Sequence, residues 1–178
     1  MQKASFLLYL NFILTLNLFS QAAAKKSINT LFPFVTDSIL LAGYKYKVEK
    51  VYLLEYSLNN KYSCSADEKN LINALKGICS HKEIQKIISD MASNSGEKFT
   101  DIPLMDKRIE LLDSSTFYKY IFQRRNIPLF TITKPVFFNH KKFCIISYGE
   151  QSGGGRGIIL KRKGKKWFIF EIICESYV

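Results

Sequence analysis

The sequence is poor in the residue types that build most metal and thiol sites. Its 178 residues include two histidines, four cysteines and one tryptophan. The histidines, His81 and His140, have no H-x-x-x-H or similar spacing, and no two cysteines form a C-x-x-C pair. The patterns of zinc knuckles and thioredoxin-like redox sites are therefore missing. We expect no metal site, no cofactor and no catalytic residue.

Long apolar runs are also missing, except at the N-terminus. There Lys3 precedes an apolar stretch, residues 6–19, and small residues including Ala22, Ala23 and Ala24 follow it. This order of basic, apolar and small regions is typical of a cleavable signal peptide. An uncleaved anchor is the alternative, but a spanning helix needs roughly 20 apolar residues and this stretch contains Asn and Thr. We predict a signal peptide at 1–24 and one domain at 25–178, periplasmic or extracellular.

Apolar periodicity predicts helices mainly in the first two thirds of the chain. Thr36 is expected to cap a short helix that Gly43 ends. Three amphipathic helices should follow, the first with Asp67 and Glu68 in its opening turn, the second capped by Ser80 and the third capped by Ser114 or Ser115 and running to Arg124. Their expected apolar faces are Leu71, Leu75 and Ile78, then Ile84, Ile87, Ile88 and Met91, then Phe117 and Ile121.

Strands are predicted where Val, Ile, Phe and Tyr gather between turn residues. In the last 50 residues they form an antiparallel meander, about 129–176, with turns at 139–141 and 163–165 and a glycine-rich loop at 149–157. The predicted fold is α+β, with N-terminal helices packed on one side of a curved C-terminal antiparallel β-meander. The expected strands are 44–56, 107–112, 129–133, 136–138, 143–148, 158–162 and 167–174.

The last predicted strand shows which of its faces should be buried. Alternate residues project to opposite faces of a strand. Phe168, Phe170, Ile172 and Cys174 are all apolar, whereas the other face includes Glu171. We therefore expect the first set to face the core.

The four cysteines would permit three pairings in an oxidising compartment. No cysteine precedes Cys64, so no lipid anchor is expected near the cleavage site. Cys64 and Cys79 would lie at opposite ends of a predicted helix, and Cys144 and Cys174 at opposite ends of predicted strands. Bonded cysteines need Cα atoms within about 7 Å, so neither pair is favoured. We expect Cys144 and Cys174 to be small buried hydrophobic residues, while cross-pairs between the two halves remain open.

The glycine-rich run 149–157 is not a recognised phosphate-binding loop. No Lys-Ser or Lys-Thr follows it, the next predicted element is a strand, and Ser152 is not in a G-x-S-x-G motif. We interpret the run as a flexible loop. Its backbone amides, beside Arg156, would suit an anion if one were bound there.

Positive charge is the strongest compositional feature. The net charge is +11, which attracts anionic polymers and surfaces, although many lysines simply solvate a surface. In a meander, the turns at 139–142 and 163–165 lie at the same end of the sheet, which brings their basic residues together, with Trp167 beside them to stack on a ligand. Lysines that protect a sheet edge are the alternative interpretation. The candidate binding residues are Lys141, Lys142, Arg156, Lys161, Arg162, Lys163, Lys165, Lys166 and Trp167.

The C-terminal segment resembles a loose group of secreted or lipid-anchored proteins of Bacteroidetes bacteria. The resemblance lies in Thr133-Lys134-Pro135-Val136-Phe137, the strand 143–148, the glycines at 153–157, and the stretch from Leu160 to Trp167. It covers about 45 of the 178 residues and implies export and a hairpin register. Many members have a lipobox cysteine or cysteines in the glycine-rich loop, and this chain has neither. The resemblance implies no activity and no functional residues.

Three functional hypotheses follow. The first is a small exported binding module without catalysis, which contacts an anionic glycan, a lipid surface or an envelope protein through the basic hairpin edge and the glycine-rich loop. The second is a periplasmic or secreted hydrolase that uses Glu150 or Glu171. The third is a structural subunit of an envelope complex.

Overall fold

The computed structural model describes most of the chain beyond its N-terminal segment. The predicted signal peptide, 1–24, lies outside the described residues. Within them, no helix combines the length and the apolar character needed to cross a bilayer. The described residues are 30–42, 44, 48–56, 68–94, 96–99, 106–123, 127–151 and 154–176.

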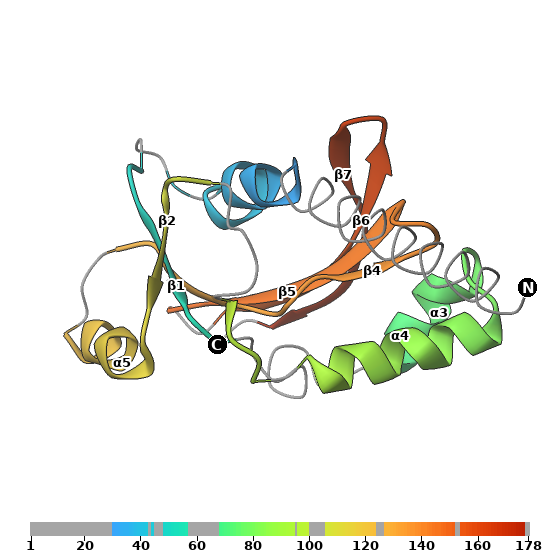
Figure 1. The fold of residues 1–178 in the computed structure, drawn as a ribbon, viewed down its shortest axis with the longest axis horizontal. Coiled ribbons are helices and arrows are strands. Elements are labelled where there is room, and N and C mark those ends of the chain that lie inside the picture. The colour runs from blue at the N-terminus through green and yellow to red at the C-terminus, as the bar shows by residue number, and fades with distance from the viewer. Residues whose placement is uncertain are drawn as a thin grey trace, which may run out of the picture.

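A seven-stranded mixed sheet forms the centre of the molecule (Figure 1). The strand order is β2-β1-β3-β5-β6-β7, and β4 also pairs with β5. β1 is parallel to β2 and β3, whereas β5 is antiparallel to β3, β4 and β6, and β6 is antiparallel to β7. The strands are β1 Val51–Leu54, β2 Ile109–Leu112, β3 Leu129–Ile132, β4 Val136–Phe138, β5 Phe143–Glu150, β6 Gly155–Lys163 and β7 Lys166–Ser176.

The α+β class and the C-terminal meander of β5, β6 and β7 are confirmed. The expectation of an antiparallel sheet is wrong for the N-terminal half. The chain leaves β1, forms two helices and returns in β2, then forms another helix and returns in β3. Crossovers of this kind join parallel strands, and β1 therefore lies between two parallel neighbours.

Helices cover both faces of the sheet, and the expectation that they cover one side is also wrong. Residues 30–35 are α-helical and continue into the π-helix η1, Thr36–Leu40, on one face. The helices α3, Glu68–Lys76, and α4, His81–Ser93, lie on the other face with α5, Ser114–Phe122 (Figure 1).

The buried side chains follow this two-sided arrangement. Every residue of β5 from Phe143 to Tyr148 is buried. Cys144 and Ile146 pack in a cluster with Leu31 and Phe32 of the N-terminal helix. Phe143 and Ile145 pack in a separate cluster with Leu75 of α3 and Ile84 of α4. Strand alternation therefore sends neighbouring residues of β5 into two different cores.

The helix starts agree with the sequence in one case and differ in two. Ser80 caps α4, as expected, and the structure adds that it does so in a capping box with Glu83. Asp113, rather than Ser114 or Ser115, caps α5 by accepting a hydrogen bond from the Thr116 amide. The bonds from Ser115 and Thr116 hold the pKa of the Asp113 carboxyl well below its usual value. Thr36 lies inside its helix and donates to the Phe32 carbonyl at 2.9 Å.

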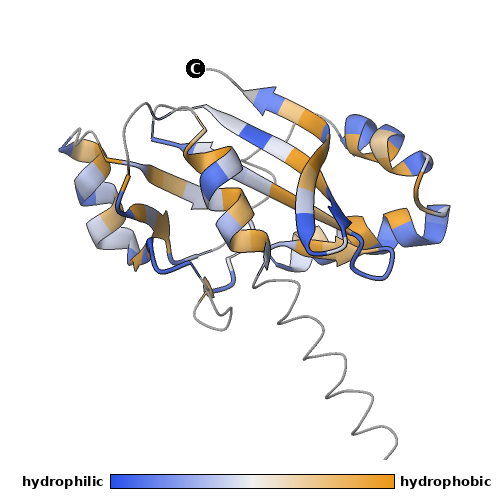
Figure 2. Cartoon of the chain, turned by 90° about the horizontal axis from the view of Figure 1, so that it is seen from above, coloured by the Kyte–Doolittle hydropathy of each residue, from blue (hydrophilic) through white to orange (hydrophobic). Residues whose placement is uncertain are grey.

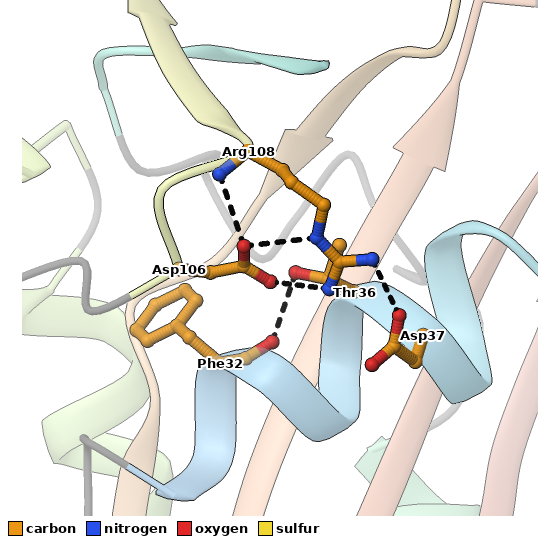
Figure 3. A network of polar contacts seen from close by, with 5 residues as sticks. All are labelled: Phe32, Thr36, Asp37, Asp106 and Arg108. Atoms are coloured by element: carbon orange, nitrogen blue, oxygen red, sulfur yellow. Dashed lines mark hydrogen bonds and ion pairs between the residues drawn. The ribbon is translucent and has the colours of Figure 1, made fainter. Parts of the chain in front are cut away.

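An ion-pair network fastens the N-terminal helix to the segment before β2 (Figure 3). The Arg108 guanidinium contacts Asp106 at 2.7 Å and Asp37 at 2.6 Å. Burial acts to raise the pKa of Asp106, but hydrogen bonds from Arg108 and Thr36 outweigh it and hold that pKa below its usual value. The network therefore holds the helix over the sheet most firmly at pH values above the pKa of an ordinary aspartate.

The predicted glycine-rich loop is largely strand. β5 extends to Glu150 and β6 begins at Gly155, so the connection is much shorter than the predicted 149–157. A Cβ added at Gly149 would lie only 2.9 Å from Thr131 Oγ1, so this glycine permits close pairing of β3 with β5. The sequence pattern could not show this, because the contact comes from a strand distant in sequence.

The cysteines partly follow expectation. Cys144 is buried and unbridged, and Cys79 is also unbridged, so the two disfavoured pairs are absent. Cys174, however, is disulfide-bonded, which corrects its interpretation as a buried hydrophobic residue. Its partner lies outside the described residues.

Candidate anion-binding surface

Two turns far apart in sequence meet at one end of the sheet. Phe143 pairs with Lys161 in neighbouring strands, and the Arg162 amide donates to the Lys142 carbonyl at 2.7 Å. The turn at 139–142 is therefore fastened beside the last residues of β6, as the meander predicted. We call this region the basic end; its residues are Lys141, Lys142, Lys161, Arg162, Lys163, Lys165 and Lys166.

The tight geometry of both turns depends on unusual backbone angles. Asn139, His140 and Lys141 have φ values of 46°, 53° and 61°. Gly164 has a φ of 62° and closes the hairpin where Lys163 pairs with Lys166. A non-glycine residue in this region is uncommon, and Asn is among the most tolerant. The turns thus hold the basic residues at fixed positions.

The basic end has little negative charge near it. Between residues 139 and 171 the sequence has two carboxylates: Glu150, at the opposite end of β5, and Glu171, which lies opposite Ile159 in β7. Within the described part of the chain, no carboxylate forms an ion pair with Lys163, Lys165 or Lys166. All three lysines are exposed. Their charges are therefore available to a ligand.

Aromatic rings lie under several of these cations. Lys161 Nζ is 5.4 Å from the Phe143 ring centre and 5.3 Å from that of Phe170. Lys163 Nζ is 6.0 Å from the Phe168 ring centre. Such contacts contribute about 0.5–1 kcal/mol at exposed sites and restrict the side chains. The basic end is therefore a mixed surface of cations and aromatic rings.

Trp167 is not available to a ligand, contrary to expectation. It is 3% exposed, and its ring packs against Phe137 with centres 6.1 Å apart. Its indole Nε1 donates to Thr30 Oγ1 at 3.1 Å. The Arg162 guanidinium lies 5.8 Å from the ring centre. Trp167 therefore anchors β7 to the N-terminal helix, and stacking on a base or sugar would require it to leave the core.

Arg156 belongs to the other end of the sheet, and its grouping with the lysines is wrong. It pairs with Tyr148 and Glu175 in neighbouring strands and forms an ion pair with Glu175 at 2.9 Å. It lies seven positions before Lys163 in β6, or about 23 Å away at the rise of a strand. The glycine-rich connection lies at the same end as Arg156, so it cannot share one contact surface with the basic end.

The predicted core face of β7 is also wrong. Four large apolar residues of this strand are exposed: Phe168 by 47%, Ile169 by 48%, Phe170 by 40% and Ile172 by 45%. β7 is the outermost strand of the described sheet, and the described helices pack against it near Trp167 and Ile173. One feature of the sequence could have indicated this exposure. The last strand of a meander has no further neighbour in that meander, and this one is apolar on both faces.

Two irregularities in β7 explain why simple alternation failed. Leu160 pairs with Ile169 and Ile159 with Glu171, which leaves Phe170 unmatched. A second register shift follows between Ile158 and Gly157. Each bulge shifts the later residues by one position relative to the sheet. No single alternation pattern could therefore assign a face to the whole strand.

The carboxylates of the hydrolase hypothesis do not form a pair. Glu150 and Glu171 are both exposed. Glu171 lies opposite Ile159, which pairs with Ile145. The two glutamates are thus five residues apart along the strands and two strands apart, or about 20 Å. Paired carboxylates of glycosidases lie about 5–9.5 Å apart.

The other groups that could perform chemistry are scattered. Burial raises the pKa of the Cys144 thiol well above its usual value, so it is not a ready nucleophile. His81 and His140 are exposed. In the described ranges, no three His, Cys, Asp or Glu side chains come together as a metal site.

Comparison with known proteins gives no family assignment. No protein-family model, curated protein or solved structure matches this chain. The resemblance of the C-terminal segment to exported proteins stays a prediction. The function must therefore be argued from the surface itself.

Proposed function

We propose that the protein is an exported, non-catalytic binding module that contacts an anionic partner through the basic end. The observation that supports this most strongly is that the fold brings basic residues from separate turns together. Two turns that are distant in sequence bring seven basic residues to one end of the sheet, and none of the ion pairs of the described residues includes Lys163, Lys165 or Lys166.

Electrostatics favours this role over simple solvation. Charges of one sign at a single end create a local field that attracts oppositely charged partners, and the attraction weakens as salt rises. Lysines dispersed for solubility would be interspersed with acids. Some lysines elsewhere do have such partners, since Lys50 pairs with Glu110 and Lys98 with Glu55. The basic end differs from these places in gathering several basic residues at one end of the sheet.

Two further features support export. The N-terminal pattern is that of a signal peptide. The disulfide bond at Cys174 is of a kind that persists in oxidising compartments, periplasmic or extracellular. No comparable observation favours the hydrolase or the structural-subunit hypothesis.

Charge reversal tests the proposal. The triple variant Lys163→Glu, Lys165→Glu, Lys166→Glu should elute from a dextran sulfate column at much lower salt than the wild type, because the local field at the basic end is removed. The fold should be retained, since all three side chains are exposed.

A matched control separates local from global charge. Lys69, Lys86 and Lys119 are exposed on α3, α4 and α5, and their reversal to Glu changes the net charge equally. We expect the control variant to lose far less retention. Equal losses in the two variants would show that retention follows net charge alone, and the proposal would fail.

A further inference from the structure

We propose that the basic end and the adjoining half of β7 together bind the surface of an anionic phospholipid bilayer. This inference rests on the proposed function, because it names the anionic partner of the same surface. It is carried by the combination of two features on one hairpin: basic side chains around the turn, and large apolar side chains left exposed directly after it.

The two features adjoin along the chain and in space. Figure 2 shows the hydrophobic colour of the outer strand β7 passing into blue at the turn of the hairpin. Phe168 pairs with Lys161, and its ring lies 6.0 Å from Lys163 Nζ. Phe170 lies beneath Lys161, with the amine 5.3 Å from its ring centre. The apolar side chains therefore lie within reach of the same ligand as the lysines.

The apolar side chains are exposed on both faces of the strand. Ile169 pairs with Leu160, which belongs to the cluster beneath the N-terminal helix. Phe170 contacts Phe143, which belongs to the opposite cluster, with ring centres 5.4 Å apart. A partner that covers all of them must approach β7 edge-on. A membrane surface can do so, because the edge of the hairpin can enter it so that both faces of β7 are in contact with it.

A soluble polyanion would engage only half of this surface. It would meet the lysines and leave Phe168, Ile169 and Phe170 in water. A bilayer offers phosphates to the lysines and an acyl boundary to the apolar residues a few ångströms deeper, where lysine stems can extend back to the headgroups. Charge complementarity and the exposed apolar edge thus point to the same partner.

Two exposed aromatic residues of α5 lack this combination. Tyr118 and Phe122 are 52% and 82% exposed on α5. They lie on an element distant from the basic end, and α5 itself contributes one lysine, Lys119. This makes them a suitable control surface, with two large side chains at least as exposed as Phe168 and Ile169 but without the lysine cluster.

The test uses sedimentation of the full chain with vesicles of phosphatidylglycerol and phosphatidylcholine, or of phosphatidylcholine alone. Every variant keeps the same N-terminal apolar run, so differences between variants report on the hairpin. The apolar variant Phe168→Thr with Ile169→Thr removes the edge side chains but keeps strand-forming residues. The control variant is Tyr118→Gln with Phe122→Gln, and the charge variant is Lys163→Gln with Lys165→Gln and Lys166→Gln.

The wild type should pellet with anionic vesicles more strongly than with neutral ones. Each lysine near an anionic surface contributes about fivefold in affinity, so the charge variant should bind about a hundredfold more weakly. Each half-exposed apolar side chain should also contribute about fivefold, so the apolar variant should lose about twentyfold on vesicles. Its retention on dextran sulfate should be unchanged, and the control variant should resemble the wild type in both assays.

The outcomes separate the two proposals. If the wild type and the apolar variant bind anionic vesicles equally, or if the protein binds dextran sulfate but no vesicles, the lipid inference is overturned while the anion-binding function stands. If the charge variant still binds dextran sulfate like the wild type, the proposed function itself fails. Unchanged circular dichroism and unfolding midpoints confirm that each variant is folded.

Discussion

The strands β5 and β7 are both largely apolar but differ in their surroundings. Both have apolar residues on each of their two faces. In β5, all residues from Phe143 to Tyr148 are buried, because one helical layer covers each face. In β7, Phe168, Ile169 and Ile172 are each nearly half exposed. A strand apolar on both faces is therefore a central strand in one place and an incompletely covered edge in another.

The difference in burial between the two strands indicates what the apolar residues of β7 do. In β5 they hold the two cores together, and each buried side chain contributes about 1.5–3 kcal/mol of transfer free energy. In β7 they obtain only part of that stabilisation, so the fold alone does not account for them. Large apolar side chains left exposed in one strand mark an interaction surface.

The strongest test of the difference between the two strands replaces one isoleucine in each of them. Ile146→Ala in β5 should lower the free energy of unfolding by about 3–4 kcal/mol, because Ile146 is fully buried and the change leaves a cavity. Ile172→Ala in β7 should cost about 1 kcal/mol or less, since Ile172 is 45% exposed. Urea unfolding followed by circular dichroism measures both, and equal losses would contradict the contrast between the strands.

A second substitution weakens the attachment of the N-terminal helix, which covers one face of β5. Arg108→Ala removes the cation that joins Asp37 and Asp106, and it leaves fewer partners for Asp106, which is 8% exposed in the native fold (Figure 3). We expect a loss of about 2 kcal/mol. Hydrogen exchange of residues 30–40 should rise more than that of α4, because the network fastens only the N-terminal helix. A uniform rise would contradict this role.

The same network predicts how stability responds to acid. The pKa of Asp106 lies below its usual value, so its stabilisation is complete above about pH 4, the pKa of an unfolded aspartate. It is lost as the pH falls through the folded-state pKa. Asp106→Asn should therefore reduce the fall in unfolding free energy between pH 5 and pH 2. An identical pH profile in the variant would show that Asp106 is not the responsible group.

The smallest expected effect concerns the helix that covers the other face of β5. Ser80→Ala removes the capping box of α4 and should cost about 1 kcal/mol. Ser80→Thr keeps the hydroxyl and should lose less. Thermal unfolding would distinguish the two, and an equal loss would argue against the cap.

Local patterns in the sequence predicted the parts of the fold that depend on local interactions. α3 and α4 were predicted because their apolar residues recur at helical spacing and Ser80 can cap the second of them. The hairpin turns were predicted from Asn139 and Gly164, which tolerate positive φ. The basic end followed from these turns, because antiparallel strands bring alternate turns to one end.

The remaining features depend on contacts between distant segments. The parallel pairing of β1 requires partners at Ile109–Leu112 and Leu129–Ile132, which no local pattern identifies. Trp167 was assigned to the surface because the N-terminal helix that covers it lies far away in sequence. Arg156 was grouped with the lysines because the glycine-rich run was taken as a loop, whereas β6 already begins at Gly155.

The most direct test of the membrane-binding surface is hydrogen exchange of the protein with and without phosphatidylglycerol vesicles. We expect protection of backbone amides at 162–172, an unchanged α5, and loss of the protection at high salt because surface charges are then screened. Protection centred on α5, or none at 162–172 while the protein is vesicle-bound, would contradict membrane binding through the hairpin.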